Sequence, residues 1–120
     1  MTAAELEQCT VLDYLALCQE RRLEEATRYL APTAILEFPG GERYETLNEM
    51  AHAAQRRYRT VRKRIDCAWS GTDGPNRRVA VSGRLEGVSA SGEPFVGVRF
   101  VDLFLLRDGI IHEQQVFNDL

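Results

Sequence analysis

The feature that most constrains the fold is a change of hydrophobic period near Arg64. Before it, apolar residues recur at the spacing of helices, and after it they alternate with polar residues as they do on strands. Helices followed by a run of turn-linked strands indicate an α+β domain, with the helices on one face of an antiparallel sheet. The length of 120 residues predicts a single domain over residues 1–120.

The first half is predicted to contain three helices. Capping-box spacing begins the first at Thr2 and the third at Thr46. A short second helix covers Leu23 to Leu30, and Pro32 ends it. The third has the clearest pattern, because its apolar residues hold one helical face for four turns at Leu47, Met50, Ala51, Ala54, Tyr58 and Val61.

Five strands are expected, one between the second and third helices and four after the third. Their predicted ranges are 34–38, 65–70, 78–88, 95–106 and 110–118. The basic run from Arg56 to Arg64 then forms the outer face of the third helix and its exit, solvated or in ion pairs between subunits.

Charge and composition exclude several partners. A net charge of −3 gives no global attraction to nucleic acid or to an anionic membrane. The longest apolar run, Tyr14 to Cys18, is too short to cross a bilayer. The first residues lack the pattern of a secretory signal, so we expect a cytoplasmic protein. The three cysteines form no CxxC motif or Cys/His cluster, which predicts free thiols and neither a metal nor another cofactor.

Asp102 is the most informative single residue. It shares a strand face with Phe100 and Phe104, and its sequence neighbours are apolar too. A buried carboxylate must be paired, hydrogen-bonded or held protonated. With no cation evident on this face, we expect a protonated Asp102 with Tyr14 as its hydrogen-bond partner; a structural carboxylate that bridges strands or pairs with an arginine is the alternative.

The last predicted strand carries polar groups on both faces. Glu113, Gln115 and Phe117 alternate with the opposite set of His112, Gln114 and Val116. Whichever set points inward, the interior beside Asp102 is expected to be a polar-lined cavity rather than a solid core.

The order of elements, together with several short segments, resembles the nuclear transport factor 2-like superfamily, whose cone-shaped α+β domains often hold a small-molecule pocket. The segments Tyr14–Leu23, Ala34–Pro39 and Val101–Ile111 are similar to the opening helices, first strand and penultimate hairpin of the ketosteroid isomerase branch. The closing segment Ile111–Asp119 is similar to the SnoaL-like polyketide cyclases.

The resemblance implies site residues. In the isomerase, a tyrosine of the first helix and a protonated strand aspartate donate hydrogen bonds to an oxyanion, which corresponds to Tyr14 and Asp102 here. The isomerase base position holds Phe38, which cannot move a proton, so Glu113 is the expected substitute. The residues expected to line the pocket are Phe38, Trp69, Phe100, Phe104, Gln115 and Phe117.

The sequence leaves three functions open. The first is a cofactor-independent isomerase, dehydratase or cyclase that acts on a small apolar, polyketide-like or steroid-like molecule. The second is a non-catalytic binder, and the third an assembly module with a vestigial pocket. Because the strands are apolar on both faces, a homodimer through the convex side of the sheet is expected, and Trp69 belongs either to that interface or to the cavity.

Overall fold

The computed structural model of the protein describes residues 1–120. Along the chain, the elements are α1 (Ala3–Gln19), α2 (Leu23–Thr27), β1 (Leu30–Phe38), β2 (Glu42–Tyr44), α3 (Leu47–Ala54), β3 (Tyr58–Asp73), β4 (Asn76–Ser89), β5 (Pro94–Arg107) and β6 (Ile110–Asn118).

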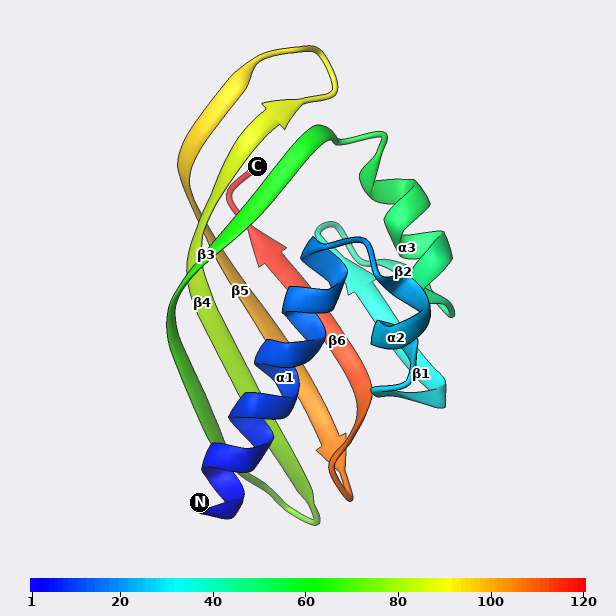
Figure 1. The fold of residues 1–120 in the computed structure, drawn as a ribbon, viewed down its shortest axis with the longest axis vertical. Coiled ribbons are helices and arrows are strands. Elements are labelled where there is room, and N and C mark those ends of the chain that lie inside the picture. The colour runs from blue at the N-terminus through cyan, green and yellow to red at the C-terminus, as the bar shows by residue number, and fades with distance from the viewer.

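The six strands form one curved, unclosed sheet in the order β2-β1-β6-β5-β4-β3. β1 runs parallel to β6, and all other neighbouring strands are antiparallel. The helices lie on the concave side, with α1 lengthwise along the sheet and α3 near its upper end in Figure 1. This arrangement confirms the expected α+β architecture.

The core lies between α1 and the concave face of the sheet. Tyr14 of α1 meets Phe104 of β5 edge to face, with the ring centroids 6.0 Å apart, and both side chains are fully buried. On β4, Val79, Val81 and Leu85 point into the same core and alternate with more exposed neighbours, as the sequence predicted. This packing fixes α1 against the strands that carry the polar groups of the interior.

The predicted length of the third helix is wrong. α3 ends at Ala54, and Tyr58 and Val61 lie on β3, where most of the basic run also lies. A bulge explains the misleading spacing: Arg59 is an extra residue between the pairs Tyr58–Ser89 and Thr60–Val88. It brings Tyr58 and Val61 to the same face of the strand although they are three positions apart, which is also a helical interval.

The first strand also differs from its predicted range. β1 begins at Leu30 and contains Pro32, where the second helix was expected to end. The short strand β2 was not predicted; it pairs with β1 and forms one edge of the sheet. The helices still cover the concave face as expected, although α2 and α3 are shorter than predicted.

Candidate functional site

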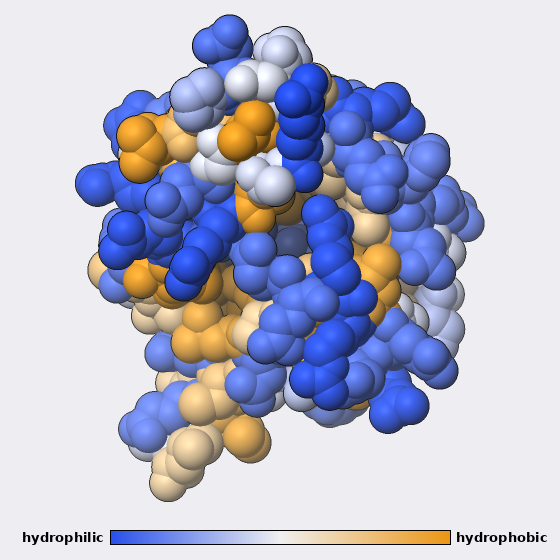
Figure 2. Space-filling view, turned by 45° about the horizontal axis from the view of Figure 1, so that its top comes forward, coloured by the Kyte–Doolittle hydropathy of each residue, from blue (hydrophilic) through white to orange (hydrophobic).

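A cavity of about 130 Å³ opens between the concave face of the sheet and helices α1 and α3. For scale, an apolar cavity of about 150 Å³ can hold one benzene molecule. This cavity is open to solvent, so a longer molecule can place one ring inside and extend out of it. The lining is mostly apolar, and its larger apolar side chains include Leu15, Leu23, Phe38, Leu47, Met50 and Phe100. Figure 2 shows a hollow on the face turned forward, bordered by both hydrophobic and hydrophilic residues.

An ion pair stands at the wall of this cavity. The Nζ of Lys63, on β3, donates to the Oδ2 of Asp102, on β5. The Asp102 side chain is fully buried, whereas that of Lys63 is 24% exposed and lines the cavity. Lys63 Nζ also lies 5.2 Å from the centroid of the Phe100 ring, within range of a cation–π interaction. The expectation that no cation faces Asp102 is therefore wrong.

Gln114 of β6 connects this ion pair to α1. Its Oε1 accepts a hydrogen bond of 2.7 Å from the Tyr14 hydroxyl, and its Nε2 donates to Asp102 Oδ2 at 3.4 Å. The Gln114 side chain is buried and also lines the cavity. The expected direct bond between Tyr14 and Asp102 is thus replaced by a bridge through Gln114, and the other Asp102 oxygen, Oδ1, is buried without a partner.

Burial keeps two groups beside the cavity protonated. It raises the pKa of Tyr14 well above its usual 10.0, with smaller contributions from Cys18 and Asp102. Burial also raises the pKa of the Cys18 thiol from 9.0 to about 11. Both groups are therefore uncharged at neutral pH, and the charged side chains that line the cavity are Lys63 and Arg21.

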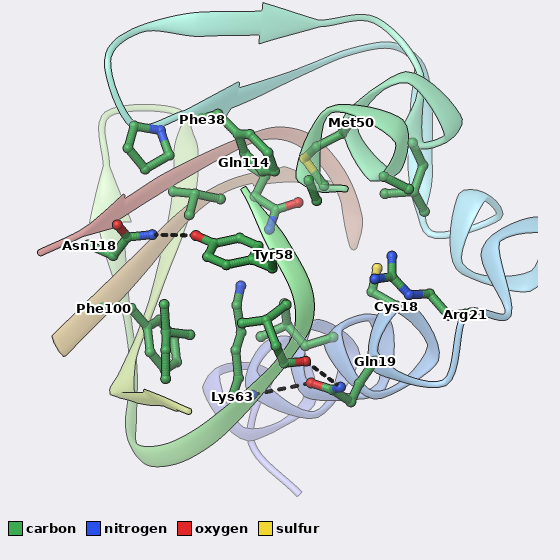
Figure 3. Close-up of a pocket in the computed structure, with 18 of the residues that line it drawn as sticks. Cys18, Gln19, Arg21, Phe38, Met50, Tyr58, Lys63, Phe100, Gln114 and Asn118 are labelled. Carbon is green, nitrogen blue, oxygen red and sulfur yellow. Dashed lines mark hydrogen bonds between the residues drawn. The ribbon is translucent and has the colours of Figure 1, made fainter. Parts of the chain in front are cut away.

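A second polar contact lies elsewhere on the lining. Asn118 Nδ2 donates to the Tyr58 hydroxyl at 3.5 Å, and both residues line the cavity (Figure 3). The Gln19 side chain of α1 bonds the β3 backbone next to Lys63: its Nε2 donates to the Val61 carbonyl at 2.9 Å, and its Oε1 accepts from the Lys63 amide at 3.2 Å. These bonds hold the end of α1 against the strand that carries Lys63.

Only some of the site residues predicted from the sequence line the cavity in the structure. Phe38 and Phe100 line the cavity, as expected. Tyr14 and Asp102 lie just behind its wall, and each contacts a residue that lines it. Phe104 is fully buried in the core against Tyr14 rather than in the lining.

The predicted inward face of β6 is wrong. Gln114 and Val116 point inward, whereas Glu113, Gln115 and Phe117 lie on the opposite face. A β-bulge is the cause, because His112 is an extra residue between the pairs Leu106–Ile111 and Leu105–Glu113. Ile111 is buried, and without the extra residue the alternation would have continued inward at Glu113.

The outward residues have other surroundings. Gln115 donates to Glu37 at 3.1 Å, and the Phe117 and Trp69 side chains are exposed on the convex face. Glu113 therefore does not meet Asp102 across the cavity. No carboxylate belongs to the lining.

Sequence reasoning missed Lys63, Gln114 and Arg21. Lys63 was hidden in the run of arginines assigned to a helix, although Val61 and Ile65 flank it at the period of a strand. Gln114 was assigned to the outward face of the last strand, and Arg21 had no distinguishing pattern. Had this alternation been interpreted as a strand that begins before Thr60, Lys63 would have been placed on the same face as Val61 and Ile65.

Two further findings concern metals and membranes. No three side chains among His, Cys, Asp and Glu gather in an arrangement that could hold a metal ion. None of the helices has the length and apolar character needed to cross a bilayer.

Family membership follows from comparison with known proteins. The model of the SnoaL-like domain family matches residues 11–114, and the chain belongs to this family, within the nuclear transport factor 2-like superfamily. No curated protein sequence matches the chain.

Solved structures agree on the fold. An NTF2-like protein of unknown function from Burkholderia pseudomallei K96243 superposes with a TM-score of 0.78 at 17% identity, over 99% of this chain and 92% of the other. A protein assigned as a SnoaL-like polyketide cyclase from Jannaschia sp. CCS1 gives 0.78 at 20% identity, over 99% and 89%. TerC, co-crystallised with polyporic acid, gives 0.77 at 21% identity, over 95% and 92%. At these identities the likeness establishes the fold alone.

Proposed function

We propose that this protein binds a small, largely apolar organic molecule in the cavity and holds one carbonyl or hydroxyl oxygen of that molecule at Lys63 and Gln114. The observation that carries the proposal is the Lys63 ammonium, which is anchored by a buried carboxylate in an otherwise mainly apolar wall. An apolar pocket with a few fixed polar groups is the usual form of a small-molecule site. The co-crystallisation of TerC with polyporic acid supports small-molecule binding on this fold.

The roles of the polar residues follow from their contacts. Lys63 has three N–H donors, and the bond to Asp102 uses one of them, so the others are available to an oxygen in the cavity. Gln114 is held by Tyr14 on one side and Asp102 on the other, which fixes the orientation of its amide. Tyr14 and Asp102 therefore act as positioning residues behind the two groups that meet the ligand.

Catalysis is the second candidate, and the same ammonium favours it. A cation held beside a carbonyl oxygen stabilises the enolate that forms when an isomerase or cyclase removes a proton. The cavity lining offers no carboxylate to remove that proton. Binding with polarisation of the oxygen is therefore the function that the geometry supports best, and turnover requires a base from the substrate itself or from water.

The test uses 2-naphthol, a neutral fluorescent molecule with one hydroxyl. We expect saturable binding to the wild type, at least fivefold weaker binding to Lys63→Met, and unchanged binding to Arg64→Met. Arg64 is the matched control because it is the next residue on β3 and has an exposed side chain. Ala54→Phe, which places a ring at the cavity lining, should abolish binding.

If Lys63→Met does not fold, the variant Lys63→Met/Asp102→Leu removes both charges and is measured instead. Absence of saturable binding to the wild type would contradict the proposal. So would binding that Ala54→Phe leaves intact, because the ligand would then lie outside the cavity.

We also infer a homodimer through the convex face of the sheet. Ile35, Trp69, Val101 and Phe117 are exposed there, and Val101 pairs directly with Phe117 across β5 and β6. Contiguous apolar residues on a sheet face are typical of protein interfaces. Sedimentation equilibrium should give a dimer at micromolar concentration, and Trp69→Glu/Phe117→Glu should give a monomer. A monomeric wild type would contradict this inference.

A further inference from the structure

The charges that line the cavity are unbalanced. Lys63 and Arg21 belong to the lining, and no aspartate or glutamate does. Lys63 is neutralised by Asp102 directly behind it. Arg21 forms no ion pair with any carboxylate of the chain. The cavity therefore carries an uncompensated positive charge at Arg21 in a protein whose net charge is −3.

Neighbouring acids do not supply the missing partner. Glu20 and Glu25 both bind Arg22, at 3.4 and 2.7 Å. Arg57, which stacks over the ring of the lining residue Phe38, is already paired with Glu42 at 3.4 Å. Of the two cations in the lining, Arg21 is thus the one that remains available to an external anion.

The backbone at Arg21 makes this residue choice unusual. Its φ of 61° is left-handed, and the amides of Arg21 and Arg22 bond the Cys18 and Leu17 carbonyls at 3.1 and 2.9 Å. This is the Schellman ending of a helix, at which glycine is the favoured residue. The backbone at the end of α1 would therefore form more easily with glycine, whereas the charge of an arginine interacts favourably with the C-terminal end of the helix. The exposed Arg21 side chain stays free to meet a ligand at the cavity.

Arg21 and Lys63 meet different parts of the cavity. Figure 3 shows the Arg21 guanidinium beside Cys18, well separated from the Lys63 ammonium, which points toward Tyr58 and Gln114. The Lys63 end, balanced by Asp102, suits an uncharged oxygen. The Arg21 end suits an anion, and a guanidinium binds a carboxylate through two parallel hydrogen bonds.

We propose that the ligand class of this cavity is an apolar carboxylate, with its carboxylate group at Arg21 and its neutral oxygen at Lys63 and Gln114. This inference rests on the proposed function and adds the ligand's second polar group. It makes Arg21 the residue that selects acids over their neutral analogues.

The experiment compares 4-hydroxycinnamate with its uncharged amide, 4-hydroxycinnamamide. Calorimetry on the wild type should show the acid binding at least tenfold more tightly than the amide, with a preference that falls as salt is raised. In Arg21→Gly the two affinities should become equal. The melting temperature of Arg21→Gly should stay the same or rise, because glycine relieves the left-handed backbone.

Arg22→Gln is the matched control, since it removes the same charge from the adjacent residue, which does not line the cavity. It should keep the preference for the acid. Equal affinities for acid and amide in the wild type would overturn the role of Arg21 while leaving the proposed function intact. Binding of 2-naphthol without binding of either cinnamate derivative would also overturn the role of Arg21 and leave the proposed function intact. Failure of all three molecules to bind would overturn the proposed function as well, and loss of the preference in Arg22→Gln would assign it to general surface charge.

Discussion

Lys63 and Asp102 form an ion pair across an intervening strand. Lys63 lies on β3 opposite Leu85, and Asp102 lies on β5 opposite Val81, so the pair spans β4. Between those two β4 residues, on the same face, is Gly83. The ion pair therefore ties the edge strand of the sheet to its interior at the wall of the cavity.

The two members of this pair should differ in their effect on stability. Lys63→Met leaves the Asp102 carboxylate fully buried without its cation, with only the Gln114 amide as a donor, and we expect a loss of about 3 kcal/mol in the free energy of unfolding. Asp102→Asn leaves the Lys63 ammonium, which is 24% exposed and can turn toward water, so its cost should be only about 1 kcal/mol. Urea unfolding at pH 7 measures both values.

The double variant Lys63→Met/Asp102→Leu serves as the control for this asymmetry. It should be more stable than Lys63→Met alone, because no unpaired charge remains. Equal losses in the two single variants would contradict a buried ionised Asp102.

Tyr14→Phe should destabilise the protein through Gln114. The variant leaves the Gln114 Oε1 buried without its 2.7 Å donor, which should cost about 1–2 kcal/mol. Tyr44→Phe is the matched control, because the Tyr44 hydroxyl bonds an exposed glutamate and its loss should cost far less. If Tyr14→Phe proved as mild as Tyr44→Phe in urea unfolding, the bridge from α1 to the ion pair would not contribute to stability.

The sequence was sufficient for the architecture and for the burial of Asp102. The change of period separates helices from strands, and an acid flanked by Phe100 and Phe104 had to lie in the interior, where the structure places it. These signals are repeated along many residues, so an error at one position does not remove them.

The site depended on single residues and was harder to predict. Two bulges, at Arg59 and His112, change which side of a strand faces inward, and neither residue type signals a bulge. One bulge made part of β3 resemble helix, which hid Lys63. The other exchanged Glu113 for Gln114, which replaced the expected base with an amide.

Gly83→Ala should show how closely β3 and β4 approach each other beside the ion pair. A Cβ at this position would lie 1.9 Å from the backbone oxygen of Arg64 and 3.0 Å from the Phe100 ring. Since the nearest atom belongs to the backbone, the strands must move, and we expect a loss of about 2 kcal/mol. Gly71→Ala on β3 is the control, because its Cβ would meet nothing within 4 Å. Equal melting temperatures for the two variants would contradict the close approach.

Stability should fall as pH rises from 9 to about 11, because of Cys18. The unfolded thiol loses its proton near its ordinary pKa of 9.0, whereas burial raises the pKa of the folded thiol to about 11. In this window the unfolded state binds fewer protons than the folded state, so each unit of pH favours unfolding. The stabilisation is complete below pH 9 and is lost by about pH 11, a total of about 3 kcal/mol. Tyr14, whose pKa burial raises well above 10.0, extends the fall to higher pH.

Urea unfolding between pH 8 and 11 compares Cys18→Ala with Cys67→Ala, whose thiol is exposed in the wild type. The Cys67→Ala variant should keep the wild-type slope, and Cys18→Ala should flatten it between pH 9 and 11 while retaining the part due to Tyr14. Iodoacetamide at pH 8 gives an independent measurement, since Cys9 and Cys67 are exposed and should react well before Cys18. A bound ligand in the cavity should slow Cys18 further, because Cys18 belongs to the lining. Identical pH slopes in the two variants, or alkylation of Cys18 as fast as that of Cys67, would mean that the thiol is not shielded by the cavity wall.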